Sequence, residues 1–376
     1  MRKVYLDNAA TTQIDPEVVE AMIPVLQSNY GNPSSIHSFG RETKALIETS
    51  RRKIAKFINA EASEIIFTSG GTEADNMIVN AAVCEMGVKH IISTCIEHHA
   101  IGHTLERVQK IHNTKITLLD LDKTGCIDLK QLEDILSKSN EKTLVTLMHA
   151  NNEIGNLLPL KEAADICKKH NALFHSDTVQ TMCHYKIDTK DIGIDFLSCS
   201  AHKFHGPKGI GFLYANKKHK LTSLITGGGQ ERGLRAGTEN VYGIVGLAKA
   251  MEIAHRDMEE HQSHISSLKA HMIAELKRVL PEVKFNGQCE FESLYTVLSI
   301  QLPANQMAAT FLYSLDIHGI AASGGSACSA GASKGSHVLE ALGVPQDVLN
   351  VRFSFGRFNT KEDIDYTVSV LQKLLS

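Results

Sequence analysis

The sequence contains no tryptophan, only eight prolines and no apolar run near the roughly 18 residues that a transmembrane helix needs. It also has little net charge, because 39 lysines and arginines stand against 42 aspartates and glutamates, which leaves −3. A protein of that charge has no general attraction for nucleic acid or for anionic lipid. We therefore expect neither membrane association nor direct nucleic-acid binding, and any anionic ligand must be held by local groups.

Closely spaced cysteine pairs are missing as well. The eight cysteines are scattered and none forms a Cys-x-x-Cys pair, which argues against both a zinc ribbon and a disulfide framework. The N-terminus meets Asp7 before any apolar stretch, so it does not resemble a secretory signal. We expect a cytoplasmic protein whose cysteines are reduced thiols, most of them buried.

Histidine, by contrast, is abundant. The 19 histidines include neighbours at His98 and His99 and a pair at His202 and His205, spacings at which imidazoles can bind metals. A metal-binding or sensing protein is therefore the non-enzymatic alternative. No complementary cysteine or carboxylate set accompanies these histidines, so we predict no metal site.

The order of apolar and polar segments predicts an α/β fold. A length of 376 residues favours two domains. Short apolar runs alternate with segments of helical period, as in a mostly parallel sheet covered by helices on both faces. The strand-like runs are residues 65–68, 90–95, 144–148, 172–175, 196–199 and 210–214. Residues 241 to about 280 predict one long connecting helix. Strand-like residues 295–300 and 350–354 and a helix over 362–375 then predict a smaller α+β domain.

Five of the strand-like runs end in clusters of polar residues. These clusters are residues 69–73, 97–99, 151–153, 176–180 and 200–203. In open α/β sheets, ligands bind just beyond the carboxyl ends of the strands. The five clusters therefore predict one shared pocket at that edge of the sheet.

Three of these clusters suggest a particular chemistry. The glycine-rich turn at residues 69–73 lies between a strand and a helix, where backbone N–H groups bind phosphate, although such a turn is more often only a turn. Lys203 lies in a tight loop that would hold its amine in place to react with an aldehyde. Asp177 provides an acid at a strand end, where it can either cap a helix or pair with a pyridinium nitrogen. Together they suggest pyridoxal 5'-phosphate as the cofactor.

The motifs, taken in this order, resemble the fold-type I, class V aminotransferase superfamily. They are residues 5–12, 31–37, 68–73, 97–98, 151–155, 177–180, 202–203 and 235–238. Within it, residues 325–331 and 351–357 resemble the cysteine desulfurases of the NifS/IscS type. The resemblance implies a large pyridoxal-phosphate-binding α/β domain over residues 14–256, with a mostly parallel seven-stranded sheet between helices. A small α+β domain would comprise residues 257–376 with the N-terminal segment 1–13 and would carry the loop of the catalytic cysteine.

The resemblance also implies a role for each site residue. Lys203 would bind the cofactor covalently, Asp177 would pair with its ring nitrogen, and His98 would stack on the ring and exchange protons. The complete predicted cofactor set is Gly71, Thr72, His98, Asn152, Asp177, Gln180, Ser200, His202, Lys203 and Thr238.

Within that set, Asn152 and Gln180 would lie near the phenolic oxygen, whereas Gly71, Thr72, Ser200 and His202 would hold the phosphate. In a homodimer, Thr238 would reach the phosphate of the neighbouring subunit. Arg352, together with Asn152, would bind the substrate carboxylate, a task that suits a planar guanidinium.

Cys328 completes the predicted catalytic set with Lys203 and His98. It lies among small residues and four glycines, so nothing around it forms a core, and we expect a mobile loop. The resemblance implies that L-cysteine is converted to L-alanine while Cys328 takes the sulfur as a persulfide. The sulfur would then pass to an acceptor protein, such as an iron–sulfur scaffold, or to thiolation. A selenocysteine lyase, or another class V enzyme of the aminotransferase type that needs no thiol, is the alternative.

Overall fold

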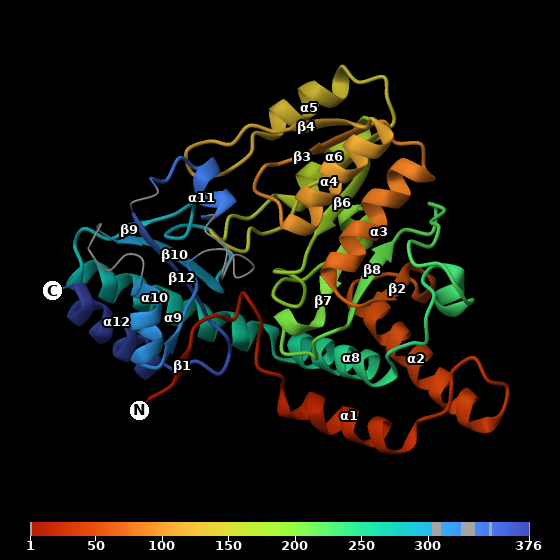
Figure 1. The fold of residues 1–376 in the computed structure, drawn as a ribbon, viewed down its shortest axis with the longest axis horizontal. Coiled ribbons are helices and arrows are strands. Elements are labelled where there is room, and N and C mark those ends of the chain that lie inside the picture. The colour runs from red at the N-terminus through yellow and green to blue at the C-terminus, as the bar shows by residue number, and fades with distance from the viewer. Residues whose placement is uncertain (1, 303–309, 325–334, 346–347, 376) are drawn as a thin grey trace.

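The computed structural model describes residues 2–302, 310–324, 335–345 and 348–375. Cys328 therefore lies outside the described residues, and so does most of the glycine-rich segment around it. The central sheet lies on one side of the molecule, and a smaller group of strands and helices, which includes both ends of the chain, lies on the other (Figure 1).

The central sheet has seven strands in the described part of the chain and is mostly parallel, as predicted. Its spatial order is β2-β8-β7-β6-β5-β3-β4, and β8 alone runs against its two neighbours. The strands are β2 (Ile65–Thr68), β3 (His90–Ser93), β4 (Lys115–Leu118), β5 (Thr143–Thr146), β6 (Leu173–Asp177), β7 (Phe196–Ser200) and β8 (Gly211–Ala215). Six of them were predicted to within a few residues. The exception is the half-exposed edge strand β4, where only two apolar residues alternate with polar ones.

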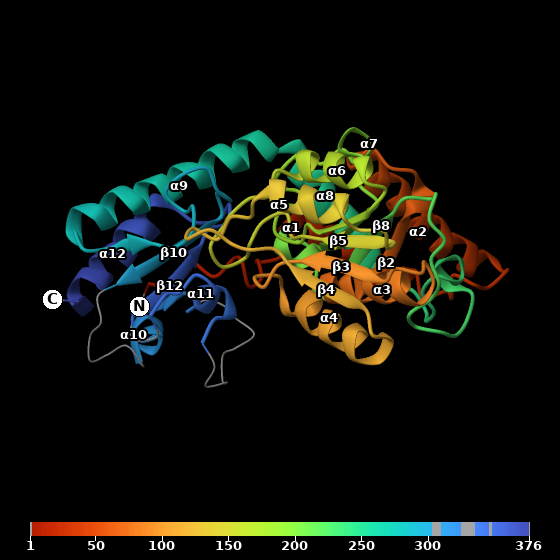
Figure 2. The same cartoon turned by 90° about the horizontal axis from the view of Figure 1, so that it is seen from above.

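Helices cover both faces of this sheet (Figure 2). Side chains alternate between the faces along each strand, so that Phe67 and Phe212 belong to one core whereas Ile66 and Leu213 belong to the other. The first core is covered by α1 (Pro16–Ser28), α2 (Ser38–Phe57), α5 (Leu129–Ser137), α6 (Leu160–Lys169), α7 (Thr189–Ile192) and α8 (Val241–Arg256), and the second by α3 (Gly71–Cys84) and α4 (His99–His112). Buried strands covered on both sides read as continuous apolar runs, which is why the sequence predicted them.

A separate hydrophobic core lies in the smaller region. It joins Val4 and Leu6 from the N-terminal segment to side chains from residues 265–371. Its antiparallel sheet has the order β12-β10-β9, and a parallel pair joins β1 to β11. The elements are β1 (Val4–Tyr5), α9 (Met258–Val279), β9 (Lys284–Phe285), β10 (Val297–Leu302), α10 (Phe311–Ile317), β11 (Ile320–Ala321), α11 (His337–Ala341), β12 (Leu349–Ser354) and α12 (Lys361–Leu375). Three short 3₁₀ helices, η1 (Ala62–Glu64), η2 (Ala201–Lys203) and η3 (Gln230–Gly233), complete the assignment for the described residues.

The prediction of one long helix over residues 241 to about 280 is wrong. The chain forms two helices, α8 and α9, which meet at Asp257. The buried residues of α8 belong to the core of the central sheet, whereas those of α9 belong to the separate core of the smaller region. The helical period of the sequence continues across Asp257, so it does not reveal that the chain changes cores there.

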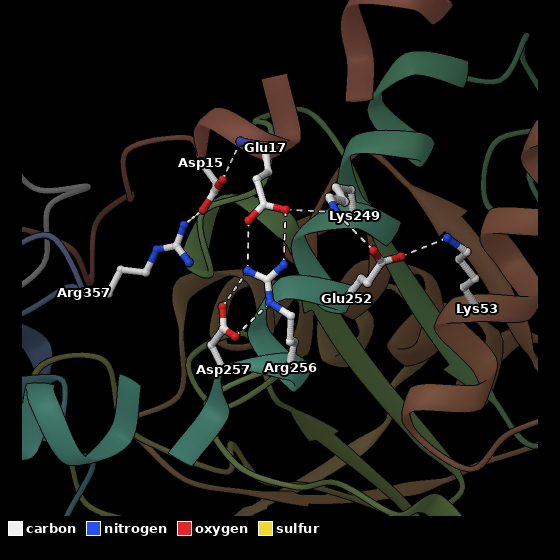
Figure 3. A network of polar contacts seen from close by, with 8 residues as sticks. All are labelled: Asp15, Glu17, Lys53, Lys249, Glu252, Arg256, Asp257 and Arg357. Atoms are coloured by element: carbon white, nitrogen blue, oxygen red, sulfur yellow. Dashed lines mark hydrogen bonds and ion pairs between the residues drawn. The ribbon is translucent and has the colours of Figure 1, made fainter. Parts of the chain in front are cut away.

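Charged side chains surround this junction (Figure 3). Arg256 donates to both carboxylate oxygens of Glu17, at 2.9 and 3.2 Å, and to Asp257 at 2.8 Å. Arg357, which follows β12, pairs with Asp15, the residue that caps the N-terminus of α1. These ion pairs connect the start of α1 with the α8–α9 junction and with the segment after β12.

Two further findings concern predictions from composition. In the part of the chain that the structure describes, no helix combines the length and the apolar character needed to cross a bilayer. The seven described cysteines are all free thiols, and four of them are buried: Cys167, Cys183, Cys199 and Cys289.

Candidate active site

One cavity of about 240 Å³ lies at the carboxyl ends of the parallel strands. All five polar clusters predicted from the sequence contribute to its walls. The predicted residues that line it are Gly71, Thr72, His98, Asn152, Asp177, Gln180, Ser200, His202, Lys203 and Arg352. Thr238 is exposed and does not line the cavity of its own chain.

The N-terminal segment forms one wall of the cavity through its backbone. Lys203 Nζ donates to the carbonyl oxygens of Ala9 and Ala10, at 2.5 and 2.9 Å. Gln180 Nε2 donates to the same Ala9 oxygen at 3.0 Å, and the backbone N–H of Thr12 donates to the carbonyl of His202 at 2.9 Å. Two carbonyl oxygens of the N-terminal segment thus hold the Lys203 amine at the cavity wall, whereas the sequence suggested only the tight loop around it.

At one end of the cavity, α3 begins without a charged anchor. Its N-cap is Gly70, which supplies no capping side chain, so the first backbone N–H groups of the helix retain their capacity to donate. A side chain at Gly71 would place its Cβ 2.5 Å from Val179 Cγ2, so only glycine fits there. Ser200 and His202 line the cavity too, and burial, together with the charge of Lys203, lowers the pKa of His202 to about 4. This end therefore offers neutral donors to an anion, and we name it the phosphate end.

A second group of side chains at the site consists of acids. Asp177 ends β6 and is buried, and its Oδ1 accepts the backbone N–H of Val179 at 2.8 Å. Burial raises the pKa of Asp177, whereas His98, the Val179 N–H and Lys203 oppose that rise. Glu97 is also buried, and desolvation raises its pKa to about 8. Asp177 lines this cavity with Asp75, which is described below, whereas Glu97 lines a neighbouring cavity, and we name these three buried acids the acid end.

His98 lies between strand β3 and helix α4, where it caps the helix. Its Nδ1 accepts the backbone N–H of Ala100 at 3.1 Å, so the neutral ring carries its proton on Nε2. Burial is the main cause that lowers the pKa of His98. The helix cap thus fixes both the orientation and the tautomer of the ring that lines the cavity.

Arg352 on β12 extends from the smaller region into the same cavity. Its side chain is only 2% exposed, and its Nη2 lies 2.9 Å from Asp7 Oδ1. The other terminal nitrogen donates to the backbone oxygen of Asn152 at 2.9 Å. These two contacts hold the guanidinium at the wall, where a planar donor can bind a carboxylate.

The residues of the cavity fit pyridoxal 5'-phosphate. The start of α3 with Ser200 and His202 suits the phosphate, Lys203 suits the aldehyde, and Asp177 suits the ring nitrogen. Among the described residues no group of three or more histidine, cysteine, aspartate or glutamate side chains is placed to hold a metal ion.

Sequence reasoning assigned no role to Asp7 or Asp75. Asp7 lies in the N-terminal motif that was quoted for the resemblance, but its contact with Arg352 joins residues 345 positions apart. Asp75 carries a clearer signal, because it shares a helix face with Gly71, Ile78 and Val79, all of them buried. A lone aspartate on the apolar face of a helix indicates either a partner or a function.

Comparison with known proteins agrees with this geometry. The family model for aminotransferase class V matches residues 4–367. A cysteine desulfurase IscS of Clostridium botulinum is 44% identical over 385 residues, an alignment that covers 100% of this chain and 94% of the relative. The structure of a NifS-like protein has a TM-score of 0.91 and 36% identity and covers 100% of this chain and 99% of its own. A structure of SspA in complex with cysteine has a TM-score of 0.81 and 30% identity, covering 95% of this chain and 100% of that one.

The chain therefore belongs to the class V aminotransferase family, whose members depend on pyridoxal 5'-phosphate. Its fold is that of the fold-type I enzymes, as the sequence predicted. Within the family it belongs with the cysteine desulfurases of the IscS and NifS type.

Proposed function

We propose that this cavity converts L-cysteine to L-alanine and that Cys328 receives the sulfur as a persulfide. The observation that carries the proposal is the convergence of Lys203, Asp177 and Arg352 on one cavity, because these groups suit an aldehyde, a pyridine nitrogen and an amino-acid carboxylate. The bound pyridoxal phosphate would supply an electron sink for the substrate's Cα. The neighbouring SspA structure contains cysteine itself, which supports cysteine as the substrate here.

The chain's own residues divide the remaining work. Arg352 and Asn152 bind the substrate carboxylate, and Asp7 holds Arg352 in the orientation that this requires. The Lys203 amine lies against the carbonyls of Ala9 and Ala10 and takes the Cα proton. Asp177 keeps the ring nitrogen protonated, which lets the ring accept charge.

Sulfur transfer balances without an added oxidant or reductant. The Cys328 thiolate attacks the substrate sulfur, an S–S bond forms, and the bond between that sulfur and the substrate Cβ breaks. The electron pair of the broken bond stays on the substrate carbon, which takes a proton and leaves as part of L-alanine. The protein then holds one extra sulfur on Cys328.

Replacement of Cys328 tests the proposal. Cys328→Ala should keep the visible spectrum of the bound cofactor and lose sulfur release, and mass spectrometry should find no added sulfur after incubation with cysteine. Cys84→Ala, which removes an exposed thiol, is the matched control and should leave both unchanged. Full turnover of Cys328→Ala, or efficient transamination by the parent protein, would favour an aminotransferase instead.

A homodimer is part of this proposal. Large apolar side chains are exposed around the α1–α2 connection and on α8: Ile23, Leu26, Tyr30, Ile36, Phe39 and Tyr242. Such a patch is typical of a subunit interface. Thr238 lies on the surface in the segment just before α8, where it could reach a neighbouring subunit's phosphate. Sedimentation analysis should find a dimer, and Ile36→Asp should weaken it; a monomeric parent protein would contradict the proposal.

Three further parts of the proposal concern organisation and setting. We place the domain boundary between residues 256 and 257, with residues 1–13 joined to the second domain, and the separate hydrophobic cores support this division.

We place the protein in the cytoplasm, where thiols such as that of Cys328 are kept reduced. The acceptor is a protein such as an iron–sulfur scaffold or a component of a thiolation system, and transfer of ³⁵S from Cys328 to a candidate acceptor tests this.

A further inference from the structure

A second aspartate lies at the acid end of the cavity and is used by none of the steps above. Asp75, in the second turn of α3, is 1% exposed and lines the cavity together with Asp177. Its Oδ1 has no hydrogen-bond partner in the described part of the chain. A fully buried carboxyl oxygen without a partner is costly, and an ionised one is costlier still.

Among the described residues, no positively charged group is a cause of the pKa shift of Asp75. The nearest titratable ring is that of His175 on β6, whose Nε2 lies 3.6 Å from Asp75 Oδ1. The two nitrogens of that ring contact the hydroxyls of Thr146 and Ser198, both at 2.9 Å. Burial lowers the pKa of His175 to about 3, so the ring is neutral.

Two carboxyl groups that share a buried cavity do not both ionise, because each charge disfavours the other. The contacts decide which one keeps its proton. Asp177 accepts the Val179 N–H and is attracted by His98 and Lys203, all of which favour its ionised form. Among the described residues, Asp75 has the Ser198 hydroxyl alone to favour its ionised form, and the negative charge of Asp177 disfavours that form.

We propose that Asp75 is a positioning residue that holds a proton as a neutral carboxylic acid, so that Asp177 is the ionised carboxylate that faces the cofactor's ring nitrogen. The inference rests on the binding of pyridoxal phosphate in this cavity. If Asp75 lost its proton, the ring nitrogen would face two negative charges and hold its own proton more tightly. Asp75 thus sets how strongly Asp177 acts on the cofactor, without touching the substrate.

Infrared spectroscopy of the holoenzyme tests the proton directly, without turnover. A protonated carboxyl has its own C=O stretching band, and at pH 7 we expect such bands from Asp75 and Glu97. Asp75→Asn should remove one band, Glu97→Gln should remove the other, and Asp177→Asn should remove neither. Loss of a band in Asp177→Asn, with none lost in Asp75→Asn, would overturn the assignment.

Cofactor affinity gives a second readout. Asparagine has the shape of a neutral aspartic acid, so Asp75→Asn should change the dissociation constant for pyridoxal phosphate less than about threefold at pH 7. Asp177→Asn removes the charge that faces the ring nitrogen and should weaken binding by about tenfold or more. Equal, large losses in both variants would contradict a neutral Asp75. A parent protein that binds no pyridoxal phosphate would instead refute the proposed function.

The pH dependence separates this role from a merely structural one. As pH rises, ionisation of wild-type Asp75 should shift the absorbance of the bound cofactor in a transition that Asp75→Asn lacks. If Asp75→Asn fails to fold, the Glu97→Gln holoenzyme must still show one protonated-carboxyl band that disappears at high pH. Absence of that band would overturn the proposal.

Discussion

The two ends of the cavity handle charge in opposite ways. The phosphate end has backbone N–H groups, the hydroxyl of Ser200 and a neutral His202, so we expect it to bind an anion through dipoles. The acid end concentrates Asp75, Glu97 and Asp177 in one buried region, with desolvation raising the pKa of each. Where neutral donors bind an anion, many groups each contribute a part of the stabilisation, whereas a buried charge is stabilised by a few partners.

That difference makes the two ends respond differently to mutation. Removing one donor at the phosphate end leaves the others in place, so the loss should be small. Changing one acid alters the charge that every other group at the acid end experiences, so the loss should be large or depend on pH. Lys203 lines the same cavity, against the backbone of Ala9 and Ala10, and Arg352 lies on the wall contributed by the smaller region.

The largest expected effect on activity comes from replacing Lys203, the residue that we expect to bind the cofactor covalently. Lys203→Ala removes the only amine that lines the cavity in the described part of the chain, so covalent attachment of the cofactor and all turnover should disappear. Borohydride reduction followed by mass spectrometry should find no cofactor fixed to the variant. Lys208→Ala, an exposed lysine in the same loop, is the control and should behave as wild type. If borohydride reduction still attached the cofactor to Lys203→Ala, the amine that binds the cofactor would be a different one.

Arg352 extends the comparison to a second proposed anion site, one built on a full positive charge. Arg352→Ala should raise KM for cysteine by about 100-fold, since a buried charge pair is worth roughly 3 kcal/mol, with cofactor occupancy retained. Arg352→Lys keeps the charge but not the planar pair of donors and should recover only part of the loss. A large loss of cofactor occupancy with KM unchanged would show that Arg352 serves the cofactor rather than the substrate.

Replacement of Glu97 tests whether the acid end makes the free energy of unfolding depend on pH. Its pKa is raised to about 8 in the folded protein, so the folded state keeps a proton that the unfolded chain loses above pH 4.5. The free energy of unfolding should therefore fall as pH rises from 4.5 to 8, by at most about 1.4 kcal/mol per pH unit. Between pH 5 and 7, Glu97→Gln should gain about 2 kcal/mol relative to wild type.

Urea unfolding at several pH values measures this difference. The buried histidines contribute equally to both proteins and cancel in the comparison. For Glu260→Gln, a change at an exposed glutamate, the difference in free energy of unfolding from wild type should stay constant between pH 5 and 7. If the difference in free energy of unfolding between Glu97→Gln and wild type stayed constant with pH, Glu97 would be ionised in the folded protein.

The sequence pattern placed Gly71, Ser200 and Asp177 near one another but gave no role to Asp75, for a physical reason. Gly71, Ser200 and Lys203 belong to short motifs next to strand ends, so local pattern alone brought them to one edge of the sheet. The proton on Asp75 depends on burial and on Asp177, which lies about 100 positions further along the chain. The carbonyls of Ala9 and Ala10, which anchor Lys203, have no side-chain signature at all. The break between α8 and α9 was missed because both helices keep the same period.

The smallest of these four effects is expected at the phosphate end, and it gives the comparison its sharpest test. Ser200→Ala removes one buried hydroxyl from a site that keeps the N-terminus of α3 and the His202 ring. A hydrogen bond to a charged group contributes about 1.5 kcal/mol, so affinity for pyridoxal phosphate should fall about tenfold at every pH. Ser93→Ala, which removes a buried hydroxyl on β3 away from the cavity, should leave that affinity unchanged. A hundredfold loss in Ser200→Ala, or a loss that varies with pH, would mean that the phosphate end also depends on one group, and the contrast between the two ends would disappear.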